Sequence, residues 1–121
     1  MTFTSIEMSA IAKLALAMAA ADGNVEKSEL TYIALELARF GVKDPDPILK
    51  GADDMDPTIA LTVVSKMTSE EKKYVAAYLG TLMAVNGDID DKELSLWRLT
   101  STLCGLPSMN IQEAINHIKN L

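Results

Sequence analysis

The sequence has 121 residues, of which 49% are hydrophobic, and this predicts a single domain over 1–121 with an apolar core. Its formal net charge of −6 argues against nucleic acid as a partner, because binding to phosphates needs a basic surface. The single cysteine excludes an intramolecular disulfide and a cysteine-based zinc site, and a mean hydropathy of +0.14 excludes a protein with many membrane spans.

The first half of the chain predicts four helices. Thr4 and Glu7 form a capping box that begins the first helix, and Gly23 follows this helix where a left-handed residue is favoured. Two proline-containing turns, at 43–47 and 56–57, begin the third and fourth helices, because proline suits the first helical turn. The first, second and fourth helices are predicted over about 4–21, 26–40 and 57–65.

The second half predicts three more helices and no strand, since no stretch alternates polar and apolar residues. Capping boxes begin the fifth helix at Thr68 and the seventh at Asn110, each with a glutamate three residues later. Asp90 and Glu93 are predicted to form the same arrangement at the start of the sixth helix. The predicted ranges are about 68–85, 90–104 and 110–121.

The apolar stretch 8–21 resembles a membrane or signal segment only superficially. It is too short to span a bilayer, Glu7 stands where a signal peptide has basic residues, and Lys13 interrupts it. We therefore expect a buried helix, no direct membrane insertion and a cytoplasmic protein, a location that suits the lone cysteine.

An internal repeat is the strongest organisational feature of the sequence. Residues 20–30 align with 84–94, which lie 64 residues further on, and the alignment continues without gaps to Gly41 and Gly105. The helices before the aligned segments are both rich in alanine and other small residues, which permit close helix packing, although alanine also simply raises helix propensity. The sequence thus predicts an all-α bundle of about seven helices, with two central alanine-rich helices and pseudo-symmetric repeats over about 1–57 and 66–121.

Two acidic loops connect the helices at the aligned positions. Their oxygen-bearing side chains occupy relative positions one, three, five and eight in both copies: Asp22, Asn24, Glu26 and Glu29 in the first, and Asn86, Asp88, Asp90 and Glu93 in the second. Such ligands suit a hard divalent cation, Ca²⁺ or Mg²⁺, although the spacing is not that of an EF-hand. The alternative is that these residues only cap helices and complement helix dipoles.

These residues also carry a family resemblance. Ala21-Asp22-Gly23, followed after five residues by Glu29, resembles the motif of the TerB-like family, named for the tellurite-resistance protein TerB and shared with DjlA-type co-chaperones. The second copy, Val85-Asn86-Gly87 with Glu93, departs from the motif because asparagine replaces its aspartate. The resemblance implies an all-helical, two-repeat domain with an acidic surface proposed to bind divalent metal. It also implies a role in stress-response or membrane-associated protein complexes and no catalytic activity.

Three functions are therefore open at this point. The first is a non-catalytic interaction domain whose acidic loops bind a cation, and the second is a purely structural adaptor or homo-oligomerising domain without metal. The third is a metal-dependent hydrolase, which requires Asp22 and Asn86 to converge on one pocket. His117 and Cys104 have no catalytic neighbours in sequence, so we expect a surface residue and a buried thiol, and we predict that the chain is not an enzyme.

Overall fold

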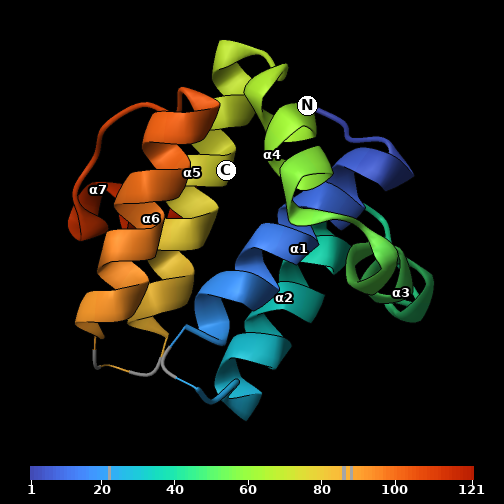
Figure 1. Cartoon of the computed structure of the whole chain (residues 1–121), viewed down its shortest axis with the longest axis horizontal. Helices are drawn as coiled ribbons and strands as arrows, with labels where there is room; N and C mark the ends of the chain where they lie inside the picture. The colour runs from blue at the N-terminus through green and yellow to red at the C-terminus, as the bar shows by residue number, and fades with distance from the viewer. Residues whose placement is uncertain (22, 86, 88) are drawn as a thin grey trace.

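The computed structural model describes residues 1–21, 23–85, 87 and 89–121, which form helices and no strand (Figure 1). The helices are α1 (Ser5–Ala19), α2 (Lys27–Arg39), α3 (Asp46–Asp54), α4 (Pro57–Ser65), α5 (Ser69–Ala84), α6 (Asp91–Cys104) and α7 (Ile111–Lys119). The predicted all-α class and the seven helices are confirmed. Within the described ranges, none of these helices has the length and apolar character needed to cross a membrane.

Local signals place the helix ends, as the sequence predicts. The Thr4 N–H donates to Glu7 Oε1 at 2.8 Å and the Glu7 N–H donates to Thr4 Oγ1 at 3.1 Å, so each residue satisfies a backbone group at the start of α1. The same reciprocal bonds begin α5 at Thr68 and α7 at Asn110. Positive φ angles follow four helices, at Gly23, Gly41, Gly87 and Gly105.

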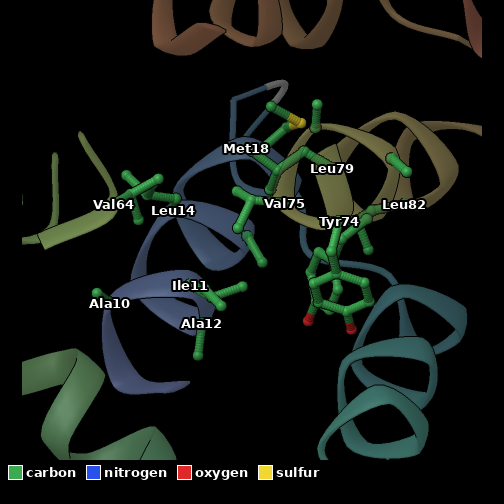
Figure 2. Packing of buried hydrophobic residues seen from close by; sticks show 14 of the residues in the cluster. Ala10, Ile11, Ala12, Leu14, Met18, Val64, Tyr74, Val75, Leu79 and Leu82 are labelled. Carbon is green, nitrogen blue, oxygen red and sulfur yellow. The ribbon is translucent and has the colours of Figure 1, made fainter. Parts of the chain in front are cut away.

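The hydrophobic core is centred on α1 and α5, which have the most buried residues of all the helices. Helix α1 packs against α3, α4 and α5, while α5 packs most extensively against α7. Figure 2 shows side chains from α1, α4 and α5 meeting in this core, with Leu14 of α1 beside Val64 of α4. The two helices that precede the acidic loops are therefore the central pair of the bundle.

The small residues of these two helices have different neighbours. Ala10, Ala12, Ala15 and Ala19 of α1 are buried, whereas Ala17 is exposed and only contributes helix propensity. Gly80 of α5 faces α6 and α7, because a Cβ at this position would lie 2.8 Å from both the Trp97 ring and the Ala114 Cβ. Gly80 thus permits α6 and α7 to pack closely against α5.

We expect Gly80→Ala to lower the free energy of unfolding by about 1–3 kcal/mol, because the added methyl overpacks a site with no space. Gly51→Ala is the matched control in another helix, since a Cβ there meets only the Ser9 side chain, whose hydroxyl would give up a single hydrogen bond to the Ile48 carbonyl on rotating away. Its cost should be below about 1 kcal/mol, because alanine also raises helix propensity. Urea unfolding of both variants tests this, and equal stabilities would contradict the close packing at Gly80.

Candidate functional site

The two acidic loops lie at the same end of the bundle. In Figure 1 the C-terminal ends of α1 and α5 and the N-terminal ends of α2 and α6 are all at the lower end of the view. The last carbonyls of α1 and α5 and the negative ends of their helix dipoles are therefore directed to this end, an arrangement that favours a cation. Asp22, Asn86 and Asp88 belong to these loops and lie outside the described residues.

The first loop turns at Gly23 and ends at a buried carboxylate. The Gly23 N–H donates to the Ala20 carbonyl at 2.9 Å, and φ of Gly23 is +94°, a conformation that glycine adopts without strain. Asn24 and Glu26 are exposed, whereas Glu29 in the first turn of α2 is only 2% exposed. Glu29 Oε1 accepts a hydrogen bond from the Glu26 N–H at 2.9 Å, so this glutamate caps α2.

The second loop has the same features at the equivalent positions. The Gly87 N–H donates to the Ala84 carbonyl at 3.0 Å, with φ of +82°. Glu93 is 5% exposed, and Asp90 is half-buried. Asp90 Oδ1 accepts a hydrogen bond from the Lys92 N–H at 2.7 Å. The donor is therefore the second residue of α6, whereas the predicted capping box uses the N–H of the third, Glu93. Both loops therefore hold a buried glutamate in the first turn of the following helix.

Five of the eight candidate metal ligands lie among the described residues. Among the described residues, no group of three or more His, Cys, Asp or Glu side chains comes together in a way that could hold a metal ion. Among the candidate ligands this finding concerns Glu26, Glu29, Asp90 and Glu93, whereas Asn24 is not of these residue types and Asp22, Asn86 and Asp88 lie outside the described residues. The convergence of Asp22 and Asn86, which a hydrolase requires, also lies outside the described residues.

A buried carboxylate that the sequence analysis missed joins α2 to α5. Glu36 is 5% exposed and its Oε1 accepts a hydrogen bond from the Tyr74 hydroxyl at 2.8 Å. The Arg39 guanidinium donates to both carboxylate oxygens, from Nε at 3.1 Å and from Nη2 at 3.3 Å, and this contact raises the Arg39 pKa. A glutamate between Ile33 and Leu37, on the apolar face of the helix, was the available signal for this site.

The Glu36 carboxylate borders a cluster of aromatic rings. Tyr74 packs against Phe40, with ring centroids 5.2 Å apart, and against Tyr78 at 5.8 Å. Tyr32 in turn packs against Tyr78 at 5.4 Å. Burial raises the pKa of all three tyrosines well above the usual value, and the negative charge of Glu36 raises each pKa further. The tyrosines are therefore neutral in the folded protein well above neutral pH.

The remaining reactive side chains take ordinary structural positions. Cys104 is buried, its Sγ lies 3.5 Å from the Leu61 carbonyl, and burial raises the pKa of its thiol, as expected for an unreactive cysteine. His117 is half-buried in the last turn of α7, where a basic residue complements the helix dipole. Among the described residues, neither Cys104 nor His117 is paired with a side chain that would make a nucleophile and its base.

The fold and the paired loops define a class of small all-helical domains with two acidic inter-helix loops at one end. No protein-family model matches the chain, and no curated protein matches it. Among solved structures, it is similar to the crystal structure of the protein of unknown function PG1108 from Porphyromonas gingivalis W83. The two are 48% identical with a TM-score of 0.88, over 100% of this chain and 99% of that chain. The chain belongs to the family of that protein.

Proposed function

We propose that the protein is a non-catalytic, TerB-like interaction domain whose acidic loops bind a divalent cation such as Ca²⁺ or Mg²⁺. The observation that carries this proposal is the pair of buried glutamates, Glu29 and Glu93, each held in the first turn after an acidic loop at the same end of the bundle. Carboxylates held in place by the fold need less ordering on cation binding than flexible surface acids do. A bound cation would then stiffen both loops and form part of a surface for a protein partner in a stress response.

We further propose that the domain is a duplicated unit, which would explain why two loops have the same chemistry. The left-handed glycines support this, because Gly23 and Gly41 recur 64 residues later as Gly87 and Gly105. Buried residues also recur at this spacing, for example Ile33 and Trp97. A rotation that superimposes 1–57 on 66–121 would support the duplication, and the resemblance to TerB-like proteins rests on the same repeated motif.

A melting experiment with metal ions tests the cation. The protein is first treated with a chelator, and its melting temperature is then followed in Ca²⁺, Mg²⁺ or Mn²⁺. A cation at about 100 times its dissociation constant adds about 2.7 kcal/mol to the free energy of unfolding, so the melting temperature should rise by several degrees. Glu29→Gln and Glu93→Gln should each weaken this rise, because glutamine fills the same space and lacks the charge; in Glu29→Gln it also keeps an oxygen for the bond from the Glu26 N–H.

Glu113→Gln provides the matched control for these variants. Glu113 also caps a helix through a bond from a backbone N–H, here that of Asn110 at 3.2 Å, but it lies in α7 outside the acidic loops. This variant should lose some stability and keep the full response to metal. The proposed cation site would be contradicted if millimolar metal left the melting temperature unchanged. It would also be contradicted if metal raised the melting temperature of the loop variants as much as that of the Glu113 variant.

The second candidate function is a structural adaptor or oligomerising domain without metal. The specific observation in its favour is that Glu29 and Asp90 already accept capping bonds, which gives the acids a role without any cation. Apolar side chains also remain exposed on the helices after both loops, including Leu35 of α2 and Leu99 of α6 at 62% and 54%. Sedimentation over a range of protein concentrations, without metal, separates this candidate from the first, since only the adaptor should associate there.

A further inference from the structure

An open groove of about 510 Å³ lies between α6 and residues 105–110, which connect it to α7. Figure 1 shows this connection as an arc that stands away from α6. Trp97, Leu106 and Met109 contribute apolar walls, and Arg98, Ser101 and Ser108 contribute polar ones. The groove has the volume of sites that hold small molecules, and it shares no residue with the eight candidate ligands of the acidic loops.

Two parts of the groove wall, Trp97 and the beginning of the connecting segment, are held in place by hydrogen bonds within the protein. The Trp97 indole N–H donates to the Ala76 carbonyl at 3.2 Å, and the six-membered part of its ring is in tight contact with Gly80. The Leu106 N–H donates to the Ser101 carbonyl at 2.8 Å, which holds the beginning of the connecting segment against α6. A site with fixed walls binds without the entropic cost of ordering them.

The charge of the groove is opposite to that of the whole protein. Of the described residues that line it, Arg98 alone is charged, in a chain with a net charge of −6. The ion pair observed within the described ranges joins Arg39 to Glu36, so Arg98 has no carboxylate partner there. The hydroxyl groups of Ser101 and Ser108 add further hydrogen-bond donors to the lining.

We propose that this groove binds a small amphipathic organic anion, whose carboxylate contacts Arg98 and whose apolar body packs against Trp97 and Met109. A guanidinium binds a carboxylate through charge-assisted and often bidentate hydrogen bonds, which a neutral ligand does not form. A cationic ligand would meet the like charge of Arg98 without any acidic residue in the lining to compensate. The indole and thioether walls favour an alkyl or aromatic body over a sugar or a free phosphate.

Octanoate is the probe, with 1-octanol and octylammonium as ligands of the same chain length and different charge. Isothermal titration calorimetry measures the three affinities, and Trp97 fluorescence locates the binding, because Trp97 is the only tryptophan. We expect saturable octanoate binding that changes the Trp97 emission, with an affinity at least about tenfold above those of the other two ligands. Arg98→Gln should reduce octanoate affinity to the level of octanol.

Lys119→Gln is the matched control, since Lys119 is an exposed basic residue of α7 that does not line the groove. It should bind octanoate as the unaltered protein does, and both variants should keep the same melting temperature. Equal affinities for the three ligands, unchanged binding by Arg98→Gln, or no binding at millimolar octanoate would each overturn the proposal. Binding of an acetylated acidic tripeptide in the absence of octanoate binding would also overturn it, by reassigning the groove to a protein partner.

Discussion

Replacing Glu36 by alanine should lower the free energy of unfolding by about 3 kcal/mol. The change leaves the buried Tyr74 hydroxyl without the acceptor that lies 2.8 Å away, and it opens a cavity between α2 and α5. Arg39 contributes less to this loss, because its side chain is 35% exposed and is able to turn toward water. Urea unfolding followed by far-ultraviolet circular dichroism measures the effect.

Two further variants separate the hydrogen bond from the cavity. Glu36→Gln keeps an oxygen for the Tyr74 hydroxyl and fills the same space, so it should cost about half as much as alanine. Tyr74→Phe combined with Glu36→Ala should cost less than the sum of the two single changes, because each residue bonds to the other. Additive losses, or a loss below about 1 kcal/mol for Glu36→Ala, would show that the Glu36–Tyr74 bond does not stabilise the fold.

A second large effect is expected at alkaline pH. All three tyrosines of the chain have pKa values raised by burial, whereas in the unfolded chain the pKa of tyrosine is about 10. The stabilisation is therefore fully present below about pH 10, and it is lost as the pH rises, because only the unfolded state then releases these protons. Three such groups should remove about 4 kcal/mol of stability between about pH 9 and about pH 11.

The absorbance of tyrosinate identifies the groups responsible. It should appear together with unfolding and not before it, and Tyr74→Phe should make stability fall less steeply with pH than in the unaltered protein. Comparing the two proteins at each pH cancels the contribution of every titratable group that they share. Tyrosinate that forms near pH 10 while the circular dichroism stays native would contradict the raised pKa values.

Helix positions were predictable from the sequence because their signals are local. Thr4 with Glu7 and Asn110 with Glu113 are close enough in sequence to form their capping bonds wherever the helix lies. The all-α class and the central place of α1 and α5 follow from the same local patterns together with the alanine content. At the acidic loops, the buried state of Glu29 and Glu93 was not predictable, since first-turn acids are usually exposed.

Features that depend on distant parts of the chain could not be predicted in this way. The partner of Glu36 is 38 residues away in sequence, and nothing near Glu36 indicates that a tyrosine hydroxyl will meet it. The small residues of the two central helices, Gly80 among them, were predicted to permit close helix packing, but the close neighbours of Gly80 are Trp97 of α6 and Ala114 of α7. Periodicity identifies the buried face of a helix and does not identify which helix covers that face. The groove beside Arg98 likewise arises only when α6, the connecting segment and α7 come together.

The packing of α1 determines what the nascent chain exposes while it is being synthesised. Its apolar face is covered in part by α5, whose residues leave the ribosome only after about 50 others have followed α1. Helices α3 and α4 are synthesised earlier and cover another, larger part, so they shield α1 while α5 is still being made. Until residue 84 has left the ribosome, part of the apolar face of α1 stays exposed, and chaperones or other unfolded chains are able to bind it.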